Sequence, residues 1–247
     1  MPFARGKVAY EVSGDGSPVL LHPGMFQIGA HWKLAGYTAA LAARHTVITM
    51  DPLGLGDSEA LLEPSDYGME RRAASVVAVL DDLGVERVAF WGYSMGALTG
   101  YAVAAHAPER LSRLVAGAFD PISGFRSAIA PTLTALGLPA DTDPYGLVKE
   151  GAAREAAQAD VIASANAGAL RANYEAFARE PGAGPALAAS GVRTLMYAGT
   201  ADPWHGPMRR YAEENGAGFF SVADADHLGG WQRTAEVLAQ VEPFLDE

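Results

Sequence analysis

A serine in the segment WGYSMGALTG, residues 91–100, lies in a pattern that could make it a nucleophile. Gly92 and Gly96 stand two positions to either side of Ser94, and an apolar run precedes the segment. A serine on a sharp turn between a strand and a helix has strained backbone angles, and the residues two positions away from it crowd together. Glycine fits such positions, so the pattern predicts a nucleophile elbow that exposes the hydroxyl and directs the N–H of Met95 toward an oxyanion.

The elements that would position this serine are predicted from the hydrophobic pattern of the whole chain. Seven apolar runs are rich in β-branched residues and bounded by turn residues, and most are continuously apolar, which is typical of strands buried on both faces. These runs are residues 7–12, 18–22, 46–51, 87–92, 113–119, 192–199 and 218–224. The segment GDGSP, residues 14–18, is expected to be a hairpin turn that leads into the first buried strand.

Segments with helical spacing lie between these runs. In residues 70–84 the apolar positions share one face, and Gly84 ends the predicted helix. Because strands and helices alternate, the sequence predicts an α/β fold with a mostly parallel central sheet covered by helices on both faces.

Residues 120–190 interrupt the alternation, because they are rich in alanine and show no strand pattern. We expect a helical cap there, inserted into a core formed by residues 1–119 and 191–247. An apolar stripe that includes Tyr174 and Phe177 is expected to be the packing face of this insertion.

The composition disfavours several classes of function. The chain has 247 residues, of which 49% are hydrophobic and 19% charged, enough for one large core. A formal net charge of −11 disfavours nucleic acid and anionic membrane surfaces as partners. The absence of cysteine excludes disulfides and thiolate chemistry. The sequence shows neither a signal-peptide pattern nor an apolar run near the ~20 residues of a membrane span, so we expect a cytoplasmic protein.

The sequence resembles the α/β-hydrolase fold family along nearly its whole length. GYSMG, residues 92–96, matches the elbow of that family, and MDPLGLGDS, residues 50–58, resembles one of its structural turns. LLHPGM, residues 20–25, resembles the His-Gly loop that supplies the second oxyanion N–H, with a proline inserted after the histidine. The second donor would then be Met25 or Gly24, and we favour Met25.

The same resemblance implies a base and an acid. His227 follows the last predicted strand, where the family carries its catalytic histidine. Asp202 follows the preceding strand, where the family usually keeps the carboxylate that orients the histidine. Asp120 is the alternative acid, because some members carry it one strand earlier, although a turn-forming role before Pro121 is the simpler account. The order Ser94, Asp202, His227 is the order of the family.

The resemblance therefore implies an esterase with a Ser-His-Asp catalytic triad, an oxyanion hole and no metal or other cofactor. An uncharged ester or lactone of small to medium size is the expected substrate, because the residues expected at the mouth of the site are mostly apolar. These substrate-binding candidates are Phe26, Trp32, Tyr145, Tyr174, Phe177 and Trp204. A carbon–carbon bond hydrolase, a cofactor-free perhydrolase and a non-catalytic ligand-binding protein of the same fold remain alternatives.

Overall fold

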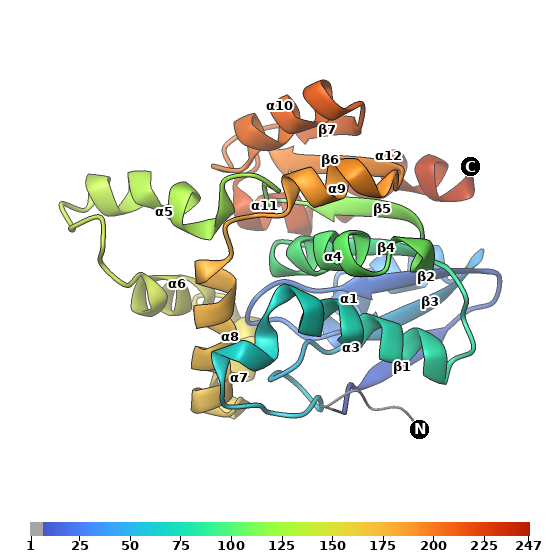
Figure 1. The fold of residues 1–247 in the computed structure, drawn as a ribbon, viewed down its shortest axis with the longest axis horizontal. Coiled ribbons are helices and arrows are strands. Elements are labelled where there is room, and N and C mark those ends of the chain that lie inside the picture. Colours follow the sequence, from blue (N-terminus) through green and yellow to red (C-terminus); the bar gives the residue numbers. More distant parts are fainter. Residues whose placement is uncertain (1–6) are drawn as a thin grey trace.

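Within residues 7–247, which the computed structural model describes, seven strands form a single sheet (Figure 1). The strands are β1 (Tyr10–Ser13), β2 (Ser17–His22), β3 (His45–Met50), β4 (Val88–Tyr93), β5 (Leu111–Gly117), β6 (Thr194–Gly199) and β7 (Gly218–Val222). Their spatial order is β1-β3-β2-β4-β5-β6-β7, in which β1 is antiparallel to β3 and the other pairs are parallel. The predicted α/β fold is confirmed, and each predicted apolar run overlaps one strand.

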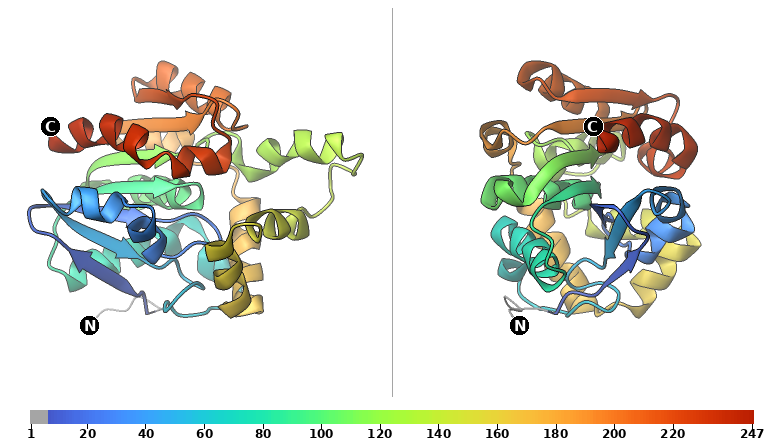
Figure 2. Two further views of the ribbon diagram at one scale, coloured as in Figure 1. Left: turned by 180° about the vertical axis from the view of Figure 1, so that it is seen from behind. Right: turned by 90° about the vertical axis from the view of Figure 1, so that its right-hand side faces the viewer.

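Helices cover both faces of the sheet (Figure 2). One face carries α1 (Ala30–Leu34), α2 (Tyr37–Leu41), α11 (His227–Gln232) and α12 (Thr234–Asp246), and the other carries α3 (Met69–Asp82), α4 (Met95–His106), α9 (Gly184–Ser190) and α10 (His205–Asn215). Two short 3₁₀ helices, Pro64–Tyr67 and Pro108–Arg110, lie in connecting loops. In the part of the chain that the structure describes, no helix is long and apolar enough to cross a membrane.

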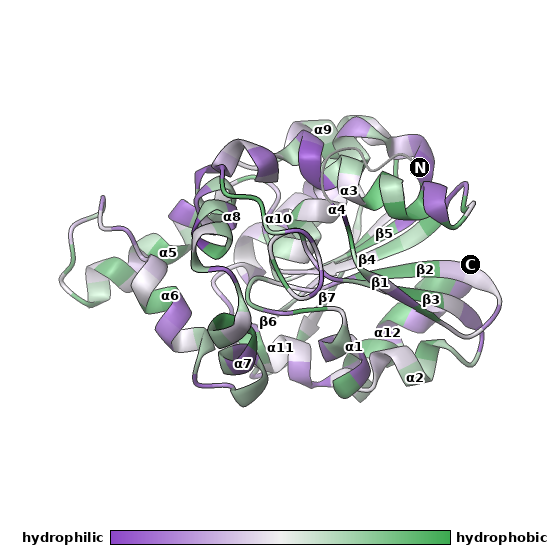
Figure 3. Ribbon diagram, turned by 90° about the horizontal axis from the view of Figure 1, so that it is seen from below, coloured by the Kyte–Doolittle hydropathy of each residue, from purple (hydrophilic) through white to green (hydrophobic). Residues whose placement is uncertain are grey.

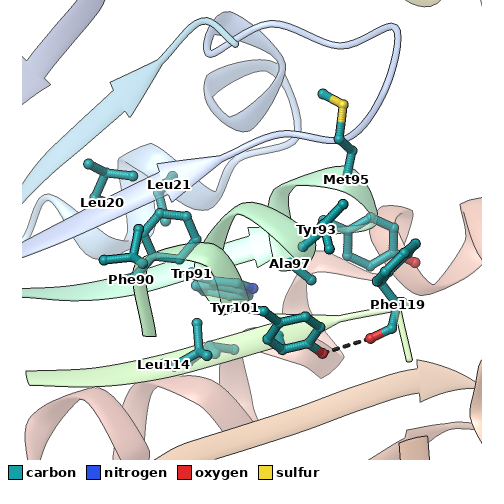
Figure 4. Close-up of a cluster of buried hydrophobic side chains, with 14 of the residues drawn as sticks. Leu20, Leu21, Phe90, Trp91, Tyr93, Met95, Ala97, Tyr101, Leu114 and Phe119 are labelled. Carbon is teal, nitrogen blue, oxygen red and sulfur yellow. Dashed lines mark hydrogen bonds between the residues drawn. The ribbon is translucent and has the colours of Figure 1, made fainter. Parts of the chain in front are cut away.

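The strand before the serine and the helix after it are buried together. Every residue of β4 is buried, and so are residues 95–104 of α4, because α3 and α9 pack against the side of α4 that faces away from the sheet. A helix that is apolar on all sides is typical of such a position. Tyr101 of α4 donates its hydroxyl to the Phe119 carbonyl at 2.7 Å and so satisfies its one polar group (Figure 4). Figure 3 shows the same division: the central strands are hydrophobic, whereas polar residues lie mainly on the outer helices.

The predicted hairpin at residues 14–18 is wrong, because β1 pairs with β3 and not with β2. The turn instead carries the chain across the start of β3. Gly14 and Gly16 have φ angles of +77° and +131°, and a Cβ on Gly14 would overlap the backbone of Ala42 and His45. The glycines that favoured a hairpin are therefore needed because another part of the backbone passes close to the turn.

Five helices lie between β5 and β6 in the described part of the chain. They are α5 (Gly124–Ala135), α6 (Tyr145–Ala152), α7 (Ala156–Ser164), α8 (Ala167–Arg179) and α9. Helices α5 to α8 lie beyond the carboxyl ends of the strands, with α5 projecting furthest, whereas α9 packs against α4 (Figures 1 and 2). The segment that lies over the end of the sheet is therefore α5 to α8.

A buried polar contact joins this segment to the core. Arg72 of α3 donates to Asn173 Oδ1 of α8 at 2.8 Å, and Asn173 Nδ2 donates to the Leu53 carbonyl at 3.0 Å. Both side chains are buried, and burial lowers the pKa of Arg72 to about 10. Removing one partner would leave the other buried and unpaired, so this contact fixes where α8 lies.

Candidate active site

Ser94 lies at the sharp turn between β4 and α4. Its backbone has a φ of +55° and a ψ of −119°, a conformation that costs free energy for any residue with a side chain. A Cβ on Gly92 would overlap the backbone of Gly96, and a Cβ on Gly96 would overlap the carbonyls of His22 and Pro23. The two glycines thus allow the close approach that the turn requires, as the sequence pattern predicts.

Asp202 and His227 come from the two loops at the carboxyl ends of β6 and β7. His227 Nε2 lies 3.2 Å from Ser94 Oγ, and His227 Nδ1 lies 2.8 Å from Asp202 Oδ2. The other carboxylate oxygen of Asp202 accepts the backbone N–H of Trp204 at 3.0 Å, which fixes the carboxylate plane. The structure therefore brings together Ser94, His227 and Asp202 in one hydrogen-bonded series.

The imidazole of His227 lies in an environment that favours its protonated form. Burial acts to lower its pKa, but the charge of Asp202 and the hydrogen bond that the imidazole donates to it, with a smaller contribution from Asp226, raise the pKa above the ordinary value. The Asp202 side chain is fully buried, whereas that of His227 is 43% exposed. Such an arrangement can accept a proton from Ser94 at Nε2 while the carboxylate stabilises the resulting imidazolium.

Asp120 does not take part in this series. It is fully buried, and its two carboxylate oxygens accept the backbone N–H groups of Ile122 and Ser123 at 3.2 and 2.7 Å. These contacts are those of a turn-forming aspartate at the start of the segment that leads to α5.

The N–H of Met95, next to Ser94 in the chain, and those of Met25 and Phe26, in the loop that lines the same cavity, have no acceptor in the described part of the chain. Met95 is the first residue of α4, where the helix dipole also favours negative charge. Gly24 N–H donates to Gln27 Oε1 at 3.0 Å and so already has a partner. The arrangement is consistent with Met95 and Met25, rather than Gly24, as the donors to an oxyanion.

The buried side chain of His22 forms a hydrogen bond within this loop. Burial lowers its pKa to about 3, so the imidazole is neutral, and its Nδ1–H donates to the Pro23 carbonyl at 3.0 Å. Because a side chain on Gly96 would overlap the carbonyls of His22 and Pro23, the loop and the first turn of α4 are in direct contact.

A cavity of about 500 Å³ opens beside Ser94 and His227 and extends beneath α5 to α8. Four of the predicted substrate-binding residues line it, namely Phe26, Tyr174, Phe177 and Trp204. Helices α5 and α6 add mostly apolar side chains to its wall.

Two predicted substrate-binding residues, Trp32 and Tyr145, do not line this cavity. Trp32 is fully buried behind Trp231, with ring centroids 4.3 Å apart, because α1 directs it toward the sheet. Tyr145 packs against Tyr174 at 4.8 Å and lies beneath the guanidinium of Arg171, outside the lining. The sequence shows that these residues are aromatic, but it does not show whether their side chains face the cavity.

Several residues of the site were not predicted from the sequence. Tyr93 lines the cavity and donates its hydroxyl to the His227 carbonyl at 2.5 Å, which holds the backbone of the histidine. Its place within GYSMG was the signal that could have identified it. Trp231, Phe125, Gln27 and Gln158 also line the cavity, and no motif marks them. Within residues 7–247, no group of three or more His, Asp or Glu side chains is placed to hold a metal ion.

Known proteins resemble the chain over its first half. A family described as the alpha/beta hydrolase fold matches residues 17–131. A protein of Azorhizobium caulinodans, named "Putative carbamate hydrolase RutD", is 38% identical over 117 residues, which are 46% of this chain and 43% of that relative. A protein of the same name from Caulobacter segnis is 35% identical over 112 residues, 44% of this chain and 41% of the relative. The matched part of the chain thus spans less than half of the length of these curated relatives.

Solved structures resemble the chain over nearly its full length. A hydrolase from Pseudomonas aeruginosa PA01 has a TM-score of 0.80 at 23% identity, with 100% of this chain and 97% of that chain covered. The enol-lactonase from Burkholderia xenovorans LB400 has a TM-score of 0.77 at 24% identity, with 98% and 97% covered. At this identity the likeness establishes the fold. Together with the match at residues 17–131, it shows that this chain has the α/β-hydrolase fold.

Proposed function

We propose that the chain is a serine hydrolase that cleaves uncharged carboxylic esters or lactones of small to medium size through an acyl-enzyme. The observation that carries this proposal is the series Ser94–His227–Asp202, with distances of 3.2 and 2.8 Å, at one end of the cavity. A serine is a weak nucleophile until an adjacent base removes its proton, and the base is useful only when a third group orients it.

In the first half-reaction, Ser94 Oγ attacks the acyl carbon while His227 Nε2 takes the hydroxyl proton. The carbonyl oxygen becomes an oxyanion, which the N–H groups of Met95 and Met25 stabilise. The ester C–O bond then breaks, and His227 returns the proton to the departing alkoxide. In the second half-reaction, His227 deprotonates a water molecule that attacks the acyl-enzyme, and the carboxylic acid and free Ser94 result.

The lining of the cavity supports an uncharged substrate. In the described part of the chain, Asp226 and His227 are the only Asp, Glu, Lys, Arg or His residues among those that line it. No arginine or lysine lies among these described lining residues to pair with a substrate carboxylate or phosphate. We also propose that α5 to α8, within residues 120–190, act as a cap that encloses the acyl or alcohol group.

A panel of p-nitrophenyl esters and γ- and δ-lactones of increasing length tests this proposal. We expect the wild-type chain to turn over the esters with an initial burst of one p-nitrophenol per chain. We also expect stoichiometric labelling of Ser94 by a fluorophosphonate. Ser94→Ala should lose all three while keeping its circular dichroism spectrum. Absence of turnover on the whole panel by a folded wild-type chain would contradict the proposal.

Hydrolysis of a carbamate is the second candidate, favoured by the similarity to the two relatives with that printed name. A carbamate carbonyl can be attacked by the same serine, because the oxyanion forms at the same place. Measuring ammonia release from carbamate alongside ester cleavage distinguishes the two. A kcat/KM higher for carbamate than for every ester would favour the second candidate.

A further inference from the structure

The loop that follows β2 is closed by one residue, Gln27. Its backbone N–H donates to the Gly24 carbonyl at 3.3 Å, and its side-chain Oε1 accepts the Gly24 N–H at 3.0 Å. Both backbone polar groups of Gly24 are therefore bonded to the same residue. Phe26, between them, has a φ of +61°, a conformation that a bulky residue adopts only when its surroundings impose it.

This closure removes the Gly24 N–H from the amides of the loop that could bind a ligand and leaves those of Met25 and Phe26. Gly24 lies against the nucleophile, since a Cβ on it would be 3.3 Å from Ser94 Cβ. Its N–H would be a natural oxyanion donor if it were free, but Gln27 occupies it. Met25 N–H, one residue further, has no acceptor in the described part of the chain. The side chain of Gln27 thus withdraws one amide and fixes the peptide that carries the next.

The orientation of the Gln27 amide follows from the same contact. A backbone N–H can only donate, so the carbonyl oxygen of the side chain faces Gly24. Gln27 is 5% exposed and lines the cavity together with Ser94 and His227. A buried residue that bonds Gly24 once through its side chain and once through its backbone is suited to positioning a neighbouring peptide.

We infer that Gln27 is a positioning residue that locks the loop so that the Met25 N–H, and not the Gly24 N–H, faces the oxyanion. This inference rests on the proposed acyl transfer at Ser94. Gln27 itself touches no reacting atom in this role; it acts through the Gly24–Met25 peptide. Without the side-chain acceptor, Gly24 N–H is unpaired and the peptide that carries Met25 N–H can rotate.

Gln27→Met tests the inference, because methionine matches the length of glutamine and removes the acceptor. We expect kcat on a p-nitrophenyl ester to fall about 10-fold to 100-fold with KM changed less than threefold, since the loss of a whole oxyanion donor costs about 10²–10³. The affinity for a trifluoromethyl ketone, which forms a tetrahedral adduct with Ser94, should fall by a similar factor. Gln158→Met makes the same chemical change on the α7 wall of the cavity, and we expect it to alter KM more than kcat, the opposite of the result expected for Gln27→Met.

A second readout does not depend on the substrate. In amide hydrogen exchange followed by NMR, the Gly24 N–H should exchange slowly in the wild-type chain and at least about tenfold faster in Gln27→Met, because a hydrogen-bonded amide is protected. Equal kcat and equal Gly24 exchange in the wild type and in folded Gln27→Met would overturn the inference. If the wild type cleaves no ester but Gly24 protection depends on Gln27, the proposed substrate class fails while the positioning of the loop stands. If Gln27→Met lowers kcat without changing Gly24 exchange, Gln27 does not act through the Gly24–Met25 peptide, and the inference also fails.

Discussion

The end of the sheet that carries Ser94 and the helical segment α5 to α8 face the same cavity, but they are built under different constraints. At Gly92 and Gly96 an added Cβ would overlap backbone atoms, whereas at Gly137 and Gly146 it would meet nothing within 4 Å. The backbone around the nucleophile therefore admits almost no alternative residue. In the helical segment such overlap with backbone occurs at Gly124, the first residue of α5, but not at Gly137, Gly146 or Gly151.

We expect these two regions to have different roles in catalysis and in substrate binding. Distances of 2.8 and 3.2 Å in the hydrogen-bonded series depend on the segments that follow β4, β6 and β7 at one end of the same sheet. The helical segment is attached to the core through α8, where Asn173 bonds the buried Arg72 side chain and the Leu53 carbonyl. We expect substitutions near Ser94 to change the rate of the chemical step, and substitutions in α5 to α8 to change which substrates bind.

The largest effect is expected for the orienting carboxylate. Asp202→Asn should lower kcat by about 10⁴, because the amide favours the wrong imidazole tautomer and cannot stabilise the imidazolium. Asp120→Asn should keep most of kcat, since its carboxylate contacts only the backbone of the next turn. Steady-state kinetics with circular dichroism as the folding control checks both variants. The reverse ranking would move the acid to Asp120 and leave Ser94 and His227 in their roles.

The next effect compares two glycines. Gly96→Ala should destabilise the fold by at least about 3 kcal/mol, because the added methyl overlaps the His22 carbonyl and the buried backbone cannot move aside. Gly146→Ala, in α6, should stabilise by about 0.5–1 kcal/mol, because alanine loses less conformational entropy in a helix. Urea titration of both variants measures these changes. Similar free energies of unfolding for the two would show that the contrast between the regions is false.

Predictions from the sequence succeeded where local sterics or chain order determine the geometry. The glycines around Ser94 can be interpreted without a structure, because a strained turn leaves room only for them. Asp202 and His227 follow strands, and the carboxyl ends of parallel strands meet at one edge, so the structure places both beside the serine. Their catalytic roles stay predictions.

Predictions failed where the local structure depends on contacts with segments that are distant in the sequence. The glycines at 14–18 were interpreted as a hairpin because the start of β3, which crosses that turn, is about 30 residues away in sequence. Trp32 and Tyr145 are aromatic residues near the site, but the direction of each side chain depends on helix packing. Gln27 could not be recognised at all, because its importance lies in one hydrogen bond to Gly24.

A smaller effect is expected in the helical segment. Val148 of α6 lines the cavity, whereas the adjacent Leu147 is 39% exposed and does not. Val148→Phe should lower kcat/KM for esters of long acyl chains about tenfold relative to acetate esters, because a lost fit of one or two methylenes is worth about 1–3 kcal/mol. Leu147→Phe makes a similar increase in size outside the cavity and should leave the chain-length profile unchanged. The same profile for both variants would mean that the substrate does not reach α6.

The smallest effect concerns the charge next to the histidine. His227 must be neutral to accept the Ser94 proton, and its pKa is raised, so kcat/KM should fall with decreasing pH around a midpoint above 6.5. The carboxylate of Asp226 contributes to that rise and also accepts the Gly229 N–H at 2.7 Å as the N-cap of α11. Asn caps helices about as well as Asp, so Asp226→Asn should keep the fold while it removes the charge. Because an anion stabilises the imidazolium, its loss should move the acidic midpoint to lower pH by less than one unit and leave the kcat on the plateau nearly unchanged. A midpoint that stays in place or moves upward would show that the charge of Asp226 does not raise the pKa of His227 and that Asp202 alone does so.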